Sequence, residues 1–281
     1  MALRALIDGI ETDCLPVDDR GLQYGDGLFE TIAVRDGGLC LWCAHFDRLC
    51  RGCDRLGISR PAPDLLLGEC RHLIRGESAS VLKIILTRGS TGRGYLAPAS
   101  QQPFRILTLH SWPDYPTARE SEGVDVTFCR TSLGESPMLA GLKHLNRLEQ
   151  VLARSEWEDP SIAEGLMQDG KGRIIGGTMS NLFLVSGKRL LTPRLDTCGV
   201  AGTVRGLVLH IADAFGIEVL EQDIAGTELI AADGLFLTNA LIGVWPVRHL
   251  GARAMSLESL PEELITAVRQ AAGKPDVERG T

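Results

Sequence analysis

One lysine stands in a setting that suits amine chemistry. Lys143 lies in the apolar segment Ala140–Asn146, and partial burial can lower the pKa of a lysine enough to make its amine a nucleophile for a Schiff base. A lone lysine among apolar residues is more often a solvated side chain whose stem packs against its neighbours. The residues alone leave both interpretations open.

A second segment suits the binding of an anion. The glycine-containing run Cys198–Arg205 is expected to lead into a helix that begins near Gly202. Free backbone N–H groups and the positive end of the helix dipole favour an anion at such a place. Gly199 lets an anion approach the backbone, and Thr203 adds a hydroxyl group. An ordinary capped helix start is the alternative interpretation.

Arginines in two places could bind carboxylate or phosphate. Arg88 and Arg93 lie in the glycine-rich loop Thr87–Tyr95, and guanidinium groups bind carboxylates through paired hydrogen bonds. An ordinary polar surface loop explains these two residues equally well. Arg48 falls on the polar face of an expected helix, where an exposed basic face is the simpler interpretation.

Hydrophobic periodicity predicts the elements that must position these segments. The apolar stripe of the helix expected at 145–157 is formed by Leu145, Leu148, Val151 and Leu152. Helices are expected at 44–56, 61–75, 145–157, 202–215 and 261–272, and strands at 3–10, 28–34, 39–42, 81–87, 104–110, 124–129, 166–168, 182–185, 190–192 and 234–238.

This order of strands and helices indicates an α+β chain of two lobes. Residues 113–121 contain two prolines and little apolar periodicity, so we expect them to form a linker. The linker would separate a smaller α/β lobe, residues 1–112, from a larger lobe, residues 122–281, which would carry Lys143 and the anion site.

Composition excludes some partners. The chain has 281 residues, 29 of them Lys or Arg and 36 Asp or Glu, for a net charge of −7. An acidic balance argues against a nucleic-acid surface, which needs clustered basic residues. The first apolar stretch is too short for a signal peptide, and no apolar run approaches the ~20 residues of a membrane helix. We therefore expect a cytoplasmic protein without a membrane partner.

The cysteines raise the question of a metal. Cys40 and Cys43 form one CxxC pair, Cys50 and Cys53 form another, and His45 lies between them. The gap between the pairs is much shorter than the ~15–20 residues of common zinc sites. The second pair also lies within an expected helix, where a thiol packs as a small hydrophobe. Buried thiols are thus favoured, and no metal site is expected.

Several motifs, taken together, resemble the pyridoxal-phosphate enzymes of fold type IV. The run RGLQYGDGLFET at Arg20–Thr31 is similar to the N-terminal motif of branched-chain and D-amino-acid aminotransferases. The run HFDRL at His45–Leu49 resembles a segment of that group whose arginine, here Arg48, grips the cofactor phosphate. Lys143 aligns with the cofactor lysine. The motifs occur in order between about residues 5 and 250.

Two later segments of the resemblance concern the phosphate. The run GTVR at 202–205 resembles the phosphate-binding helix start, and residues 238–247 resemble a late strand and loop that touch the same group. The resemblance implies a two-lobe homodimer whose cleft the neighbouring subunit completes. The residues implied to bind pyridoxal 5'-phosphate are Arg48, Lys143, Gly202, Thr203, Val204, Asn239 and Ala240.

Two stretches resemble aminodeoxychorismate lyases more than transaminases, namely Thr87–Tyr95 and Leu139–Gln150. The implied reaction converts the small molecule 4-amino-4-deoxychorismate to 4-aminobenzoate and pyruvate in folate biosynthesis. Lys143 would be the catalytic residue that takes the C4 proton. The residues implied to bind the substrate are Arg93, Arg88, Tyr95 and Tyr24.

One position departs from the family. The family places a glutamate that pairs with the pyridine nitrogen in a segment ending Asn-Leu-Phe, and this chain has Gly176 there. Another group, such as a water or Glu164, could replace it. Alternatively, the enzyme works with a weaker electron sink, which aromatisation of the product compensates, or the chain is an impaired variant.

Two other functions stay open at the level of sequence. A D-amino-acid or branched-chain transaminase would use the same fold, although the loss of the glutamate and the Thr87–Tyr95 loop speak against it. A catalytically impaired dimer that binds the cofactor or a partner is supported by Gly176 and opposed by the intact Lys143.

Overall fold

The computed structural model describes residues 4–97 and 101–276, which form two compact units. Unit 1 contains the chain up to Pro113, the segment Leu142–Asn146 and the residues from Gly273 onward, and unit 2 contains Asp114–Gly141 and Arg147–Ala272. Helices and strands alternate in both units, which confirms the expected α+β class. The segment around Lys143, expected in the C-terminal lobe, packs instead within unit 1.

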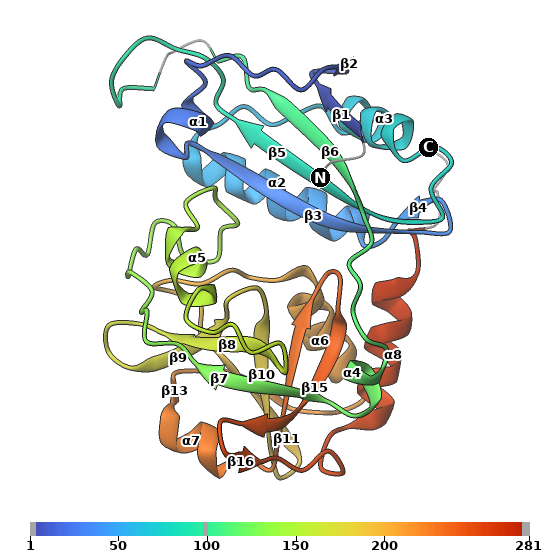
Figure 1. Ribbon diagram of the computed structural model, residues 1–281, viewed down its shortest axis with the longest axis vertical. Helices are drawn as coiled ribbons and strands as arrows, with labels where there is room; N and C mark the ends of the chain where they lie inside the picture. The colour runs from blue at the N-terminus through green and yellow to red at the C-terminus, as the bar shows by residue number, and fades with distance from the viewer. Residues whose placement is uncertain (1–3, 98–100, 277–281) are drawn as a thin grey trace. The chain divides into compact units, whose positions relative to one another are not determined.

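Unit 1 is built on a six-stranded antiparallel sheet in the order β2-β1-β6-β5-β3-β4 (Figure 1). The longest pair, β3 and β5, runs in register from Gly27 opposite Thr87 to Arg35 opposite Ala79. The strands are β1 (Arg4–Ile7), β2 (Ile10–Glu11), β3 (Gly27–Arg35), β4 (Gly38–Leu39), β5 (Ala79–Thr87) and β6 (Arg105–Ser111).

Helices α2 (Trp42–Leu56) and α3 (Pro63–Leu73) pack on this sheet, while the short helix α1 (Arg20–Tyr24) precedes β3. Alternate residues of the strands, such as Ile32, enter the core between sheet and helices because side chains of a strand alternate between its faces. Cys53 lies in this core and is fully buried, so it packs as a hydrophobe.

Unit 2 contains a sheet in the order β12-β11-β10-β14-β15-β7-β8-β9-β13, with β16 paired to β15. Its strands are β7 (Val124–Phe128), β8 (Ile162–Gln168), β9 (Arg173–Gly177), β10 (Asn181–Ser186), β11 (Arg189–Pro193), β12 (Val219–Gln222), β13 (Ile224–Ala225), β14 (Gly234–Asn239), β15 (Gly243–Leu250) and β16 (Arg253–Ala254). Its helices are α4 (Ala118–Ser121), α5 (Leu148–Arg154), α6 (Thr203–Ala214), α7 (Gly226–Ala231) and α8 (Glu262–Gly273), the last of which ends in unit 1.

Two sequence-based expectations need correction in unit 2. Part of the expected linker is helix α4, which packs against β15. The helix expected at 145–157 is the shorter α5, and its apolar stripe is exposed: Leu148, Val151 and Leu152 are 77%, 57% and 61% exposed. Periodicity finds an apolar face but does not tell whether the same chain covers it.

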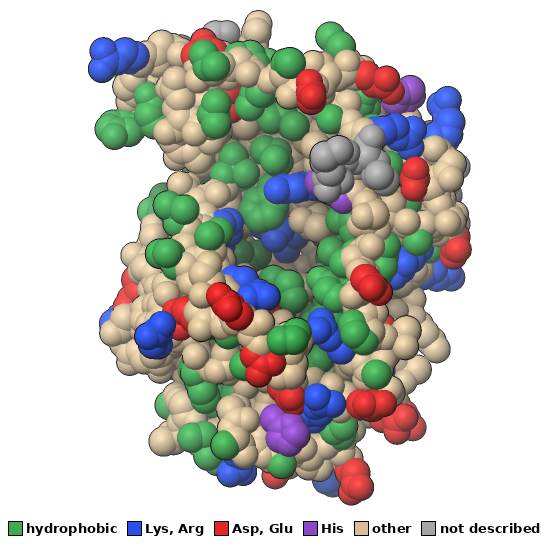
Figure 2. Space-filling view, in the orientation of Figure 1, with side chains coloured by type: hydrophobic (Ala, Val, Ile, Leu, Met, Phe, Trp, Pro, Cys, Tyr) green, Lys and Arg blue, Asp and Glu red, His purple; other side chains and the backbone are tan. Residues whose placement is uncertain are grey.

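The surface carries charges of both signs. On the face drawn in Figure 2, Lys and Arg side chains are interspersed with Asp and Glu side chains. Within residues 4–97 and 101–276, no helix combines the length and apolar character needed to cross a bilayer.

Candidate active site

Lys143 is positioned by main-chain bonds to strand β3. The N–H of Phe29 donates to the carbonyl of Lys143 at 2.9 Å, and the N–H of Leu145 donates to the carbonyl of Gly27 at 3.0 Å. A Cβ atom on Gly27 would lie 2.5 Å from the carbonyl oxygen of Leu86, so glycine permits this close approach. The lysine segment therefore lies beside β3 and forms an isolated antiparallel bridge with it, between His144 and Leu28.

The side chain of Lys143 is half-buried and lies over an aromatic ring. Its Nζ atom is 4.2 Å from the ring centroid of Phe29, a distance at which the ring face attracts an ammonium ion. The ring thus provides an apolar support for the stem of Lys143 and a weak hold on its cationic form. A fixed, partly desolvated amine is the setting that a Schiff-base lysine needs.

Arg48 is anchored by a buried carboxylate that the sequence did not reveal as a site residue. Glu30 is 1% exposed and accepts from Nε of Arg48 at 2.8 Å, from Nη2 of Arg48, and from Nδ1 of His45 at 2.6 Å. Glu30 stands between Leu28 and Ile32 on the inward period of β3. The sequence contained one indication of this role: a charged residue at a strand position whose side chain is expected to be buried, since a buried charge usually has a partner.

Opposing effects set the protonation of this cluster. Burial alone would raise the pKa of Glu30, but the charge and hydrogen bonds of Arg48, together with those of His45, outweigh it and hold that pKa at about 2. Burial lowers the pKa of His45, against the attraction of Glu30, and the charges of Arg48 and Lys143 add to the lowering. His45 is thus neutral and donates its Nδ1 proton to Glu30.

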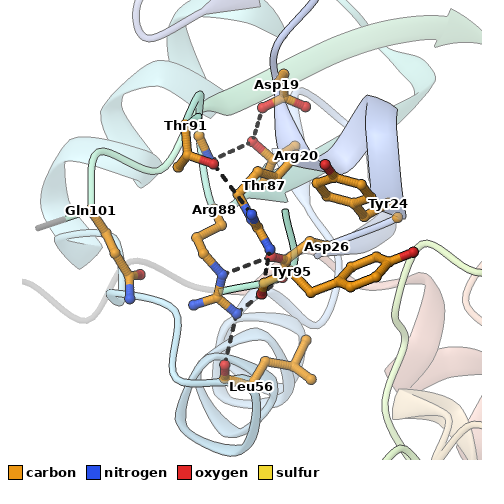
Figure 3. A network of polar contacts seen from close by, with 12 residues as sticks. Asp19, Arg20, Tyr24, Asp26, Leu56, Thr87, Arg88, Thr91, Tyr95 and Gln101 are labelled. Atoms are coloured by element: carbon orange, nitrogen blue, oxygen red, sulfur yellow. Dashed lines mark hydrogen bonds and ion pairs between the residues drawn. The ribbon is translucent and has the colours of Figure 1, made fainter. Parts of the chain in front are cut away.

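The four residues expected to bind substrate separate into two groups. Tyr24 and Tyr95 meet edge to face at 5.4 Å between ring centroids, and the Tyr24 hydroxyl accepts from the N–H of Gly94 at 3.3 Å (Figure 3). Arg93 belongs to the same loop and is exposed. Arg88, in contrast, is 6% exposed and turns away from the solvent.

The donors of Arg88 are used within unit 1. Its Nε and Nη2 atoms donate to Asp26 at 2.8 and 3.0 Å, and its guanidinium also donates to the carbonyls of Gly57 and Leu56 at 2.7 and 2.9 Å. These contacts, of which those with Asp26 and Leu56 are drawn in Figure 3, give Arg88 a structural task and do not support the expectation that it binds a substrate carboxylate.

In unit 2, helix α6 begins at Thr203 with Gly202 as its N-cap. The first N–H groups of a helix have no partner within it, and here these belong to Thr203, Val204 and the next residue. The hydroxyl Oγ1 of Thr203 is buried and has no hydrogen-bond partner among the described residues. A helix start with an unsatisfied hydroxyl beside it is a suitable anion site.

Asn181 holds the loop that leads to this helix start. Its Oδ1 atom accepts from the N–H of Gly202 at 3.1 Å, and its Nδ2 atom donates to the carbonyl of Val200 at 2.8 Å. A Cβ atom on Gly202 would lie 2.1 Å from Oδ1 of Asn181, so only glycine allows this approach. Asn181 is a positioning residue that sequence analysis missed, although it opens the Asn-Leu-Phe segment.

Strand β14 brings a second unsatisfied hydroxyl to the same region. Thr238 pairs in register with Asn181 on β10, and its buried Oγ1 atom has no partner among residues 4–97 and 101–276. The next residue, Asn239, uses its side chain to shape the turn that contains Ala240: Oδ1 accepts from the N–H groups of Leu241 and Ile242 at 2.8 and 2.9 Å. Two orphan hydroxyls beside a helix start fit the oxygens of a phosphate group.

The position of the expected glutamate is shaped around glycine. A Cβ atom on Gly176 would lie 2.8 Å from the carbonyl oxygen of Ser180, and one on Gly177 would lie 2.6 Å from the carboxylate of Glu164. The first contact is with backbone and cannot be relieved by a rotamer change. The turn 177–180 is thus built for two consecutive glycines.

Glu164 is buried beneath that turn and is fully engaged there. Its Oε1 atom accepts from the N–H and the hydroxyl of Thr178 at 3.0 and 2.6 Å, and its Oε2 atom accepts from the hydroxyl of Ser180 at 2.8 Å and the N–H of Met179 at 3.2 Å. These bonds show what Glu164 does: it closes the 177–180 turn, which leads directly into Asn181.

Comparison with known proteins identifies the family. The family model for amino-transferase class IV matches residues 27–250. An aminodeoxychorismate lyase of Vibrio harveyi is 36% identical over 88% of this chain and 91% of its own length. A putative branched-chain-amino-acid aminotransferase of Methanocaldococcus jannaschii is 28% identical over 88% of this chain and 86% of its own length.

Solved structures give the same picture. The 4-amino-4-deoxychorismate lyase of Pseudomonas aeruginosa superposes with a TM-score of 0.91 and 44% identity, covering 96% of this chain and all of that one. The branched-chain aminotransferase of Escherichia coli has the same fold, with a TM-score of 0.84 and 24% identity over 96% of this chain and 93% of its own. The chain therefore belongs to the amino-transferase class IV family.

Proposed function

We propose that this protein is a pyridoxal-phosphate-dependent lyase that converts 4-amino-4-deoxychorismate to 4-aminobenzoate and pyruvate. The observation that carries the proposal is that, among proteins of the same fold, the chain has higher sequence identity to two lyases than to two aminotransferases. Identity is 36% and 44% to two proteins named as lyases of this substrate, against 28% and 24% to two named as branched-chain aminotransferases.

The cofactor residues fall into two sets. Pyridoxal phosphate, when bound, supplies an electron sink for the carbon that bears the substrate amine. Lys143 and Arg48 are the unit 1 residues assigned to it, and the start of α6 with Gly202, Thr203 and Val204 is the phosphate site of unit 2. The orphan hydroxyls of Thr203 and Thr238 support this assignment. Asn239 and Ala240 contribute the neighbouring turn.

Lys143 would move the proton. Its amine is held beside Phe29 by the bonds between the lysine segment and β3, which fixes the direction from which it reaches a substrate. It would take the proton from C4, and the electrons of that C–H bond would form the ring double bond that makes the product aromatic. The C–O bond to the enolpyruvyl group would break with its electron pair on the oxygen, and the leaving enolate would take up the proton carried by Lys143 and tautomerise to pyruvate.

The substrate carries carboxylates. Residues 90–96, which form the largely exposed part of the loop after β5, are suited to bind them. Arg93 is a solvent-exposed guanidinium, and Tyr95 and Tyr24 place two phenols next to the loop backbone. Arg88 is assigned to the loop's support and not to the substrate, because its donors are committed.

Gly176 is compatible with a lyase. Gly176 offers no carboxylate to a pyridine nitrogen, and the carboxylate of Glu164 is engaged in the 177–180 turn, so we infer that carbanion stabilisation by the cofactor is weaker than with a glutamate. Aromatisation of the product drives the lyase step, whereas a transaminase has no such help. The weaker sink thus counts against the transaminase more than against the lyase.

The test measures both products. Enzyme loaded with pyridoxal phosphate is given 4-amino-4-deoxychorismate, and we expect 4-aminobenzoate and pyruvate in equal amounts. Lys143→Ala should abolish turnover and the visible absorption band that borohydride removes, while Lys188→Ala, in the exposed turn after β10, should change neither. Transfer of an amino group from D-alanine or a branched-chain amino acid, without 4-aminobenzoate formation, would contradict the proposal.

We further propose that the protein is a cytoplasmic homodimer. All eight cysteines are free thiols, which suits a reducing compartment. The exposed stripe of Leu148, Val151 and Leu152 on α5 is an apolar face of the kind that a second subunit covers.

A further inference from the structure

The exposed part of the loop Arg88–Leu96 is held by one buried guanidinium. Arg20 on α1 is 3% exposed. Its Nη1 atom donates to the carbonyl of Gly94 at 2.8 Å and to the hydroxyl of Thr91 at 3.2 Å, and its Nη2 atom donates to the carbonyl of Tyr95 at 3.2 Å (Figure 3). Three acceptors of this one side chain therefore belong to the loop.

The fourth acceptor connects the loop's exposed part to its base. Nε of Arg20 donates to Oδ2 of Asp26 at 2.8 Å, and the same carboxylate accepts the bonds of Arg88. Arg88 in turn donates to the carbonyls of Leu56 and Gly57 where α2 ends. One carboxylate thus couples both arginines, and through them it fixes the loop to α1 and α2.

Without Arg20 the loop would keep few restraints. Gly92 and Gly94 are exposed, and Gly94 has a φ of +105°, so the backbone has unusual freedom there. Tyr95 is 87% exposed. The loop's other contacts are an isolated main-chain bridge between Ser90 and Asp19, a bond from the Thr91 hydroxyl to the Gly92 carbonyl, and the contacts with Tyr24, which are a bond of 3.3 Å from the N–H of Gly94 and the edge-to-face rings. The contacts of Arg20 with the loop come from a buried side chain, whereas those of Tyr24 are exposed to solvent.

We propose that Arg20 is a positioning residue for the substrate, which it serves by fixing the loop that carries Arg93 and Tyr95. The inference rests on the proposed function, in which that loop meets the substrate's carboxylates. A loop fixed before binding loses less entropy when the substrate arrives, so the hold lowers KM. Arginine has five donors spread over three nitrogens and here reaches four acceptors at once, whereas a lysine ammonium has three donors on a single atom and cannot reach all four.

The first experiment compares Arg20→Lys with Arg51→Lys, a matched change at an exposed arginine of α2, both loaded with pyridoxal phosphate. Arg20→Lys keeps the charge next to Asp26, but its shorter ammonium cannot keep all three bonds to the loop. We expect KM for 4-amino-4-deoxychorismate to rise about tenfold, the effect of one or two hydrogen bonds, with kcat within about twofold. Arg51→Lys should change neither constant.

The second readout does not depend on activity. Arg93 is exposed, and a loosened loop should be cut by trypsin after this residue. We expect cleavage between Arg93 and Gly94, identified by fragment masses, to be about tenfold faster in Arg20→Lys than in Arg51→Lys, since the fraction of open loop rises by the same factor. The Tm should stay within about 2 °C, because the fold's core is untouched.

The two readouts separate the possible failures. If wild-type enzyme makes no 4-aminobenzoate, the proposed function fails, and trypsin still decides whether Arg20 holds the loop. Unchanged cleavage after Arg93 in Arg20→Lys overturns the inference, as does faster cleavage with an unchanged KM. Should Arg20→Lys fail to fold, Thr91→Val removes one loop acceptor of Arg20 and should raise both quantities in the same direction, about threefold.

Discussion

At the scale of single residues, the proposed phosphate site depends on Asn181 and on the unpartnered hydroxyls of Thr203 and Thr238. Asn181→Ala removes both bonds that hold residues 200–202 before α6. The helix start would then be ordered only when the phosphate binds, so we expect Kd for pyridoxal phosphate to rise about tenfold. Fluorescence titration measures this, and an unchanged Kd would show that Asn181 does not position the site.

Glu30 and His45 make the fold's stability depend on pH. Glu30 has a pKa of about 2 in the fold against an ordinary 4.5, so its stabilisation is complete above pH 4.5 and is lost as the pH falls toward 2. The pKa of His45 is lowered below its ordinary 6.5, so the fold's preference for neutral His45 is satisfied above pH 6.5 and costs stability as the pH falls below it.

The two ranges can be distinguished by one variant. The free energy of unfolding should decline from pH 6.5 downward in the wild type and less steeply in His45→Gln, which keeps a donor for Glu30 without titrating; the lowered pKa of His110 contributes equally to both proteins. Urea unfolding at a series of pH values measures this. Equal slopes between pH 6.5 and 5 in both proteins would show that His45 is not buried in its neutral form.

At the scale of elements, the network around Asp26 joins α1, the end of α2 and the loop Arg88–Leu96. Burial alone would raise the pKa of Asp26, but the hydrogen bonds and charges of Arg88 and Arg20 outweigh burial. The pKa of Asp26 is therefore lowered from its ordinary value, and the carboxylate is ionised. Asp26→Asn leaves two buried guanidiniums without a counter-charge, which should cost about 3 kcal/mol. Asp54→Asn, at an exposed pair with Arg60, is the control and should unfold like wild type in urea.

The turn 177–180 decides what can replace Gly176. A side chain at this position meets the Ser180 carbonyl at 2.8 Å, and moving that carbonyl displaces the start of β10 at Asn181. We expect Gly176→Glu to weaken cofactor binding and to give no gain in lyase turnover. If Gly176→Glu bound the cofactor as tightly as the wild type and had a higher kcat, the turn would accept a side chain at position 176, and this prediction would be wrong.

Sequence patterns located most elements of the fold and left their surroundings open. Periodicity found β3, β5, α2 and α6 within a few residues because each buries a regular apolar face. Strand β9 was missed since it ends in two glycines, which are unfavourable in strands. Gly176 is required by the carbonyl of Ser180, and Gly177 by the Ser180 hydroxyl and the distant carboxylate of Glu164, contacts that no local pattern contains.

The same limit applies to the candidate site. Family motifs identified Lys143, Arg48 and the start of α6, because such motifs can be recognised in the sequence alone. The tasks of Arg88 and Arg20 depend on Asp26, Leu56 and loop carbonyls that only the fold brings near. Arg88 and Arg93 look alike in the sequence, and burial alone separates the structural guanidinium from the exposed one.

At the scale of the whole molecule, the exposed apolar stripe of α5 argues for a second subunit. Three large side chains at positions i, i+3 and i+4 stay in water in the single chain, although their burial would contribute about 1.5–3 kcal/mol each. A monomer gains nothing from such a stripe, whereas a symmetric dimer can bury it twice. The stripe therefore supports a second subunit, whereas the buried cores of the two units carry no information about assembly.

Charge placed on this stripe should break the dimer. Val151→Glu introduces a carboxylate that would be desolvated in the proposed interface, so we expect sedimentation velocity at micromolar concentration to show a monomer in place of the dimer proposed for the wild type. Ile230→Glu, on the exposed side of α7, is the matched control and should remain dimeric. The Tm of the Val151→Glu monomer should fall because dimerisation stabilises the folded state by mass action. A Val151→Glu protein that stays dimeric would place the subunit contact elsewhere and leave the α5 stripe to another partner.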